Sequence, residues 1–276
     1  MQWKSFPLES RRFAGNLLSM SARPYVLTET NWKSIQETPC EVAILPWGAT
    51  EAHNYHLPYG TDNIQLDHIA AEAARIAGGE GAHVMVLPCV PFGVNTGQLD
   101  IPLCLNMNPS TQMAVLADII DSLDRQGIRK LVVLNGHGGN CFKQITRELQ
   151  ARFPRVFLST VNWFKVLEPR AYFDKPGDHA DELETSLMMH LAPGLVRPLE
   201  EAGDGATRAP RLRAIRESWA YAQRDWLKAT VDTGSGDPSL ATAEKGRVFF
   251  DALTEKIATY LVDLANVDTG DLYETE

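Results

Sequence analysis

The chain has 276 residues, a formal net charge of −9 and a hydrophobic content of 44%. This length fits one large α/β domain or two small ones, and the composition is ordinary for a globular protein. The negative charge argues against nucleic acid, whose phosphates need a basic surface, and against a polybasic membrane patch. No apolar run approaches the roughly 20 residues of a membrane-spanning helix. The N-terminal residues lack the pattern of a secretory signal, so we expect a cytoplasmic protein.

Short apolar runs alternate with longer amphipathic segments along the chain. The short runs are predicted strands, and the segments with apolar residues at three- and four-residue steps are predicted helices. The alternation indicates an α/β fold with a parallel sheet covered on both faces, and we expect residues 1–276 to form a single domain. In chain order the predicted elements are strand Val42–Leu45, helix Asn63–Ala77, strand His83–Leu87, helix Thr111–Arg125, strand Lys130–Leu134, helix Asn140–Phe153, strand Val156–Val161 and helices Glu182–Leu191, Arg211–Leu227 and Ala241–Leu264.

Two potential metal ligands, Glu51 and His53, follow the first predicted strand. Side chains at i and i+2 of extended backbone point the same way, so both can face one cavity. Asp62 comes after a turn and immediately before the first predicted helix. It is either the N-cap of that helix or, together with the two residues upstream, a third metal ligand. Mixed nitrogen and oxygen ligands of this kind suit zinc, manganese or iron(II).

His137 follows the third predicted strand, within the segment 135–140, Asn-Gly-His-Gly-Gly-Asn. Glycines there allow a sharp turn and the close approach of a metal or substrate. One alternative is a glycine-rich turn that merely holds a hydrogen-bonded histidine. A phosphate-binding loop is disfavoured, because no Lys-Ser/Thr pair follows. Since Glu51, His53 and His137 all follow strands of a parallel sheet, we expect them at its carboxyl edge, where ligands bind.

His179 precedes the predicted helix Glu182–Leu191, whose first turn is rich in acids. Acids suit the N-terminus of a helix on structural grounds alone, but three of them exceed what a cap needs. Glu184 is the one expected to point inward, as a metal ligand or as support for the metal site. Two carboxylates and two imidazoles fit a pair of metals better than one, with Asp62 as the bridge. The sequence therefore predicts a metal-dependent hydrolase.

These segments resemble the creatininase family, also called creatinine amidohydrolase-like proteins, over roughly residues 40–265. The resemblance implies a three-layer α/β/α sandwich that assembles as hexamers built from dimers. It also implies hydrolysis of cyclic or linear amides at a two-metal centre of zinc with zinc, manganese or iron. The segments that match in order are Glu51-Ala52-His53, Leu57 to Asp62, Asn135 to Asn140, His179 to Ser186, Gly236-Asp237-Pro238 and Ala241 to Gly246.

The resemblance further implies roles for individual residues. Glu51 and His137 would hold one metal and His53 the other, while Asp62 would bridge them. His179 would shuttle protons, and Glu184 would support the centre.

Two features depart from creatininase proper. There, a glutamate two residues after the strand-end histidine completes the second metal site, whereas this chain has Gly139. The second metal is then expected to rely on Glu184 or on water, or to bind more weakly. Tryptophans that cover the substrate ring in creatininase are missing shortly before His179, and only Trp163 lies nearby. Creatinine is therefore not the expected substrate, and the Gly-Gly form resembles the branch with formylamidopyrimidine-type deformylases and enzymes that trim modified peptides.

We expect metal-bound hydroxide to cleave a C–N amide bond of a small cyclic or linear, non-peptide substrate, with His179 protonating the leaving nitrogen. The expected partners are this small-molecule amide and further copies of the chain in a homo-oligomer, a hexamer by analogy, and neither nucleic acid nor membrane. Substrate choice is expected to depend on the loops 92–108, 163–178 and 203–235. Two alternatives stay open: an inactive or regulatory metabolite-binding relative, suggested only by Gly139, and a single-metal lyase or isomerase.

Overall fold

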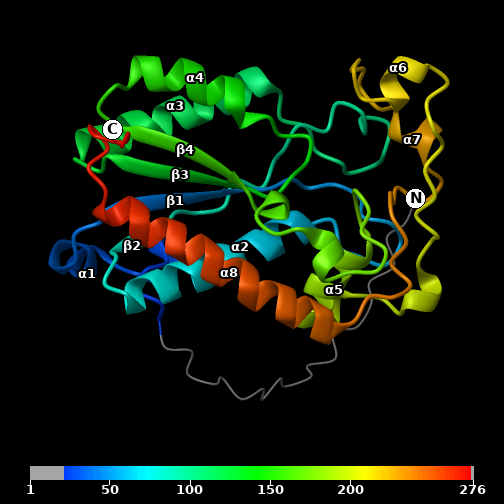
Figure 1. Ribbon diagram of the computed structural model, residues 1–276, viewed down its shortest axis with the longest axis horizontal. Helices are drawn as coiled ribbons and strands as arrows, with labels where there is room; N and C mark the ends of the chain where they lie inside the picture. The colour runs from blue at the N-terminus through cyan, green and yellow to red at the C-terminus, as the bar shows by residue number, and fades with distance from the viewer. Residues whose placement is uncertain (1–21, 275–276) are drawn as a thin grey trace, which may run out of the picture.

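A computed structural model describes residues 22–274 of the chain. Four parallel strands form one sheet in the order β2-β1-β3-β4, with helices on both faces (Figure 1). The predicted α/β fold is therefore confirmed, while a single domain over residues 1–276 stays a prediction. The strands are β1 Val42–Trp47, β2 Val84–Val86, β3 Lys130–Asn135 and β4 Phe157–Asn162.

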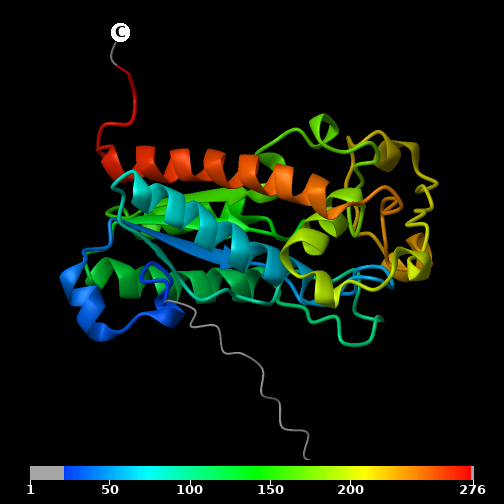
Figure 2. The same ribbon diagram turned by 90° about the horizontal axis from the view of Figure 1, so that it is seen from below.

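Successive side chains of each strand supply two separate halves of the core. In β1, Val42 and Ile44 pack with α2, α5 and α8, whereas Ala43 and Leu45 pack with α3 and α4. This division follows because neighbouring side chains of a strand point to opposite faces, and both faces of a parallel sheet are covered. The result is a three-layer α/β/α arrangement, with α2 and α8 side by side over one face (Figure 2). The covering helices are α2 Thr61–Gly79, α3 Pro109–Arg125, α4 Phe142–Arg152, α5 Glu182–Leu191 and α8 Ala243–Asn266.

The helix predicted over Arg211–Leu227 is wrong. Only two short helices lie there, α6 Arg213–Arg216 and α7 Trp226–Ala229, and the residues between them are irregular. A helix of this length gains most of its stability by burying an apolar stripe. The apolar residues of this segment stay exposed instead; Trp219, for example, is 73% exposed.

The other predicted strands and helices agree with the structure to within two residues at each end. The short helix α1 Trp32–Glu37 and several single turns of 3₁₀ helix were not predicted. The 3₁₀ helices are Leu27–Glu29, Trp163–Lys165, Pro169–Ala171, Pro193–Leu195 and Leu199–Glu201.

No helix among residues 22–274 combines the length and the apolar character needed to cross a bilayer.

The sheet register brings two site-bearing loops together. Trp47 at the end of β1 is the register partner of Asn135 at the end of β3. The loops that follow these two residues therefore leave the sheet side by side, which places Glu51, His53 and His137 at its carboxyl edge. The first turns of α2 and α5 reach the same edge, because these two helices pack on each other.

Candidate metal centre

Asp62 stands between two imidazoles at the start of α2. Its Oδ1 lies 2.9 Å from His53 Nε2, and its Oδ2 lies 3.3 Å from His137 Nδ1. Asp62 is buried, and its Oδ2 accepts no hydrogen bond of good geometry. Gly60 occupies the N-cap position of α2, and the carboxylate makes no capping bond. The N-cap alternative is therefore wrong, and the unsatisfied oxygen is free for a cation.

Both imidazoles turn one ring nitrogen to a backbone carbonyl and the other to carboxylates. His53 Nδ1 lies 3.1 Å from the Glu51 carbonyl, and His137 Nε2 lies 3.0 Å from the Val94 carbonyl. A carbonyl accepts only from N–H, so in a neutral ring the nitrogen that faces the carboxylates has a lone pair. For His137 this nitrogen lies 2.7 Å from Glu51 Oε1, a repulsive approach unless a proton or metal ion lies between them. Histidines that ligate metals have this hydrogen-bond arrangement.

Two clusters of metal-ligand side chains share Asp62. Glu51, Asp62 and His137 form the first cluster, and His53, Asp62 and Glu184 form the second. Within each, the donor atoms lie within 4.8 Å of one another. Each cluster offers one imidazole and two carboxylates, a donor set that suits zinc, manganese or iron(II). Because one carboxylate belongs to both clusters, the residues fit a pair of ions bridged by Asp62.

Glu184 is the acid of α5 that reaches these clusters. Its Oε2 lies 3.9 Å from His53 Nε2 and accepts a hydrogen bond from the Ala180 amide at 2.5 Å. The other two acids at the start of α5 have structural roles. Asp181 caps the helix by accepting from the Glu184 amide at 3.0 Å, and Glu182 forms an ion pair with α8. The structure thus brings Glu184, as well as Glu51, His53, Asp62 and His137, to one place.

Position 139 has no space for a side chain. A Cβ atom at Gly139 would lie 2.3 Å from the Val94 carbonyl oxygen and 2.4 Å from His137 Nε2. Both contacts are far inside van der Waals distance, and relieving them would displace the histidine of the first cluster. A carboxylate near the second cluster therefore comes from Glu184 on α5 and not from the loop after β3.

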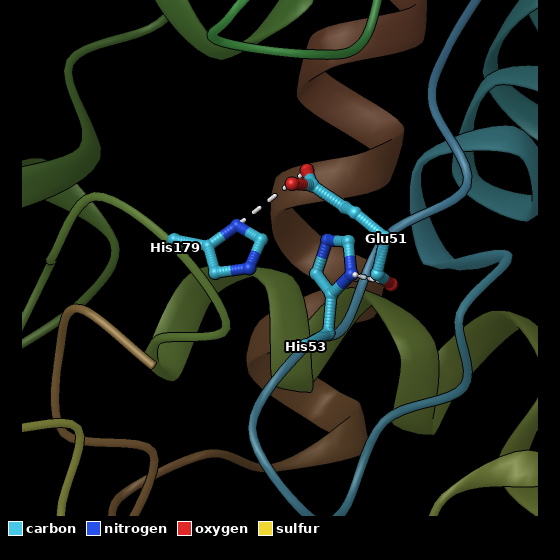
Figure 3. A group of neighbouring side chains, drawn as sticks. All are labelled: Glu51, His53 and His179. Atoms are coloured by element: carbon cyan, nitrogen blue, oxygen red, sulfur yellow. Dashed lines mark hydrogen bonds and ion pairs between the residues drawn. The ribbon is translucent and has the colours of Figure 1, made fainter. Parts of the chain in front are cut away.

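His179 lies beside Glu51 of the first cluster and His53 of the second (Figure 3). Its Nε2 lies 2.8 Å from the Ala52 carbonyl, which leaves Nδ1 facing Glu51 Oε1 at 3.8 Å. Its ring packs on the ring of His53, with the two ring centroids 4.1 Å apart. The ring of Trp226 packs edge-on against the ring of His179, with the ring centroids 4.9 Å apart. Burial and the neighbouring His53 lower the pKa of His179, so the ring is neutral near pH 7 with the Nδ1 lone pair toward Glu51. Such a ring can accept and return a proton.

Three residues for which the sequence predicted no role complete the centre. Gln98 donates a hydrogen bond to Glu51 Oε2, which holds that carboxylate in place. Val94 fixes the ring of His137 through its carbonyl, and Trp226 packs on His179. Val94 and Gln98 lie in a loop and Trp226 begins the short helix α7, and no motif or spacing in the sequence distinguishes any of the three.

A cavity of about 1150 Å³ opens over the centre. Residues of both clusters and His179 line its inner part. Its walls come from residues 94–98, 163–164 and 207–229, within the loops expected to govern substrate choice. Trp163 is part of the wall, although it is almost fully buried.

Metal uptake is expected to release protons. Burial lowers the pKa of His53, but Asp62, Glu184 and Glu51 raise it more, to about 10. Burial raises the pKa of Glu184 to about 8. Both groups are therefore protonated at pH 7 without metal, and they must lose those protons to coordinate an ion.

The affinity for Zn²⁺ should consequently increase with pH between about 6 and 9. Calorimetric titration of the metal-free protein in buffers of different ionisation enthalpy checks this expectation. Heats that are equal in all buffers would show that no proton leaves, contrary to the expectation.

The fold and the site define a class of protein, an α/β protein with a histidine and carboxylate centre at the carboxyl edge of its sheet. Residues 28–261 match the family model Creatininase, described as creatinine amidohydrolase. The match spans most of the chain, and the chain belongs to the creatininase family. The resemblance noted from the sequence is thereby confirmed.

Known relatives agree with this assignment. A crystal structure from Bacteroides fragilis NCTC 9343, named "Putative creatinine amidohydrolase", is 45% identical, covers 91% of this chain and 99% of its own, and superimposes with a TM-score of 0.86. The mycofactocin precursor peptide peptidase of Mycobacterium tuberculosis is 28% identical over 219 residues, 77% of this chain and 81% of the relative. The creatinine amidohydrolase of Pseudomonas putida is 29% identical over 192 residues, 61% of this chain and 72% of the relative.

Proposed function

We propose that this chain is a two-metal amidohydrolase that cleaves the C–N bond of a small cyclic or linear amide. The observation that carries the proposal is the sharing of Asp62 by two clusters in each of which an imidazole nitrogen faces carboxylate oxygens. Relatives named as an amidohydrolase and as a peptidase support the same reaction type. The centre's donor atoms favour zinc, manganese or iron(II).

The residues of the centre would have different roles in this reaction. Two divalent ions, one in each cluster, would polarise the amide carbonyl and lower the pKa of water. Gln98 would keep Glu51 oriented for its ion, and the Val94 carbonyl would keep the His137 tautomer that presents Nδ1. His179 Nδ1 would accept a proton from the attacking water and deliver it to the leaving nitrogen, with the ring held by the Ala52 carbonyl.

Replacement His179→Gln should lower kcat by about 10²–10⁴-fold, the usual contribution of a positioned acid or base. The donor atoms of Glu51, His53 and His179 also lie within 4.8 Å of one another, but His179 belongs to neither cluster that shares Asp62, so we expect metal content to stay at the wild-type level. Steady-state kinetics on an amide substrate and elemental analysis of the same sample check both parts. A variant with the wild-type kcat would remove His179 from proton transfer.

A substrate screen tests the proposed reaction itself. Cyclic amides, formamides and short peptides should be offered to the zinc-loaded and manganese-loaded protein, with and without chelator. We expect hydrolysis of at least one class that stops on chelation and returns with added metal. Hydrolysis that persists after complete removal of metal would contradict the proposal.

The alternatives have less support. An inactive or regulatory relative was suggested only by Gly139, and Glu184 provides a carboxylate within 3.9 Å of His53 Nε2. A single-metal lyase or isomerase would use only one cluster, whereas both clusters have the donor types of a metal site.

We also propose that the chain assembles as a homo-oligomer, a hexamer by analogy with the family. The loops 92–108 and 203–229 expose large apolar side chains, which commonly mark contacts with another chain. Among these side chains are Leu99, Leu103, Trp219 and Tyr221. The cytoplasmic location stays a prediction.

A further inference from the structure

Residues between 207 and 229 line the cavity, and the segment 203–232 that contains them, here called the mouth segment, lies beyond the carboxyl edge of the sheet (Figure 1). The Gly203 amide donates to Asn54 Oδ1 at 2.8 Å, and the Trp226 amide donates to the Gly97 carbonyl at 3.1 Å. Gly97 allows this approach, because a Cβ there would lie 2.1 Å from the Arg224 carbonyl oxygen. The mouth segment is therefore fixed over the centre at more than one point.

Five basic residues of the mouth segment line the cavity. Two of them, Arg224 and Lys228, are each paired with an aspartate. The other three, Arg208, Arg211 and Arg216, form no ion pair with any residue from 22 to 274. Arg208 and Arg216 donate only to backbone carbonyls, and the guanidinium of Arg211 has no hydrogen-bond partner in that range.

The carboxylates that line the same cavity do not balance these three arginines. Glu51, Asp62 and Glu184 belong to the two clusters, and Asp181 caps α5. The remaining two are the aspartates already paired within the wall. A chain with a net charge of −9 thus places over its candidate active site three cations that have no ion-pair partner within the described part of the chain. Charge of one sign in a cleft concentrates ligands of the opposite sign.

We propose that the substrate carries an anionic oxygen group, a carboxylate or a phosphate, which Arg208, Arg211 and Arg216 bind while the amide lies at the metal centre. This inference rests on the proposed function. Guanidinium groups match such oxyanions with paired hydrogen bonds. The cavity of about 1150 Å³ can hold a ligand that reaches from the mouth to the centre. The ring of Trp226, against His179, provides an apolar wall along that path.

Binding of hydroxamic acids that differ only in their terminal group tests the proposal on the zinc-loaded protein. The hydroxamate group chelates the metal, and a spacer of varied length ends in a carboxylate, a phosphonate or a neutral methyl ester. Calorimetry should give at least about 10-fold tighter binding for one of the anionic probes than for the ester, as expected for charge-assisted hydrogen bonds. The anion that binds tighter distinguishes a carboxylate substrate from a phosphate substrate.

The double variant R208A/R211A, which keeps only Arg216 of the three, should lose most of this preference and bind the ester as the wild type does. Arg213→Ala is the matched control, since Arg213 lies in the same segment, is paired with Glu217 and does not line the cavity. Circular dichroism verifies that each variant is folded. The control should keep the full preference.

Three other outcomes would contradict the inference. Equal binding of anionic and neutral probes by the wild type, or a preference that is undiminished in R208A/R211A, would overturn the inference and leave the metal centre intact. Failure of every probe to bind the zinc-loaded protein would contradict the proposed function, and the inference with it.

Discussion

Asp62→Asn should deprive the protein of both metal ions and lower kcat/KM by on the order of 10³-fold or more. The amide keeps the size of the carboxylate but loses its charge, and its NH₂ group presents hydrogens where Asp62 now faces His53 or His137. Loss of a residue that merely supports a metal ligand costs about 10–100-fold. Loss of a residue shared by both clusters should lower activity by a larger factor, because it affects two ions at once.

Elemental analysis and kinetics of the purified variant measure the two effects. Asp67→Asn is the matched control, because Asp67 is exposed on the same helix and lies outside both clusters. The control should keep the metal content and rate of the wild type. An Asp62→Asn protein that retains both ions and full activity would contradict the role of Asp62 as a bridge.

Glu184→Gln should empty the second cluster and leave the first one occupied. Glu184 contributes to the cluster with His53, whereas the cluster with His137 draws its other carboxylate from Glu51. We expect the metal content to fall from about two ions to about one, with a loss in kcat of roughly 10²-fold or more, since a two-metal site needs both ions. Glu182→Gln is the control on the same helical turn, and it should keep both ions.

Adding Gly139→Glu to the Glu184→Gln variant should not restore the second ion. The family resemblance implies a glutamate ligand at this position in creatininase, but here its Cβ would collide with the Val94 carbonyl and with His137. The double variant should bind no more metal than Glu184→Gln and should have a lower melting temperature. Recovery of the second ion and of the rate would show that the loop adapts and that Gly139 is no barrier.

The fold could be predicted largely from the sequence because its signals are local. The four strands are short apolar runs, and helices such as Glu182–Leu191 repeat their apolar residues at helical spacing. The error at Arg211–Leu227 arose because apolar residues at that spacing stay exposed in the folded chain. Periodicity predicts a helix only where a core exists to receive its apolar face.

The candidate site could be predicted in part. Strand ends and spacing pointed to Glu51, His53 and His137, but a residue at the start of a helix, such as Asp62, can be a cap or a ligand. Only the tertiary structure separates the two, by placing its oxygens against two imidazoles.

Contacts between segments far apart in the chain could not be predicted from the sequence. Gln98 reaches Glu51 across 47 positions of the chain. Trp226 reaches His179 because its amide is bound to the Gly97 carbonyl. Neither contact follows from a motif, since both depend on how separate loops pack over the edge of the sheet.

Anomalous diffraction from crystals grown with zinc tests the paired centre most directly. We predict two peaks about 3.5–4 Å apart, the usual spacing of paired catalytic ions. The carboxylate of Asp62 should lie between them, with His137 on one ion and His53 on the other. One peak alone, or two peaks with no shared carboxylate, would contradict the account.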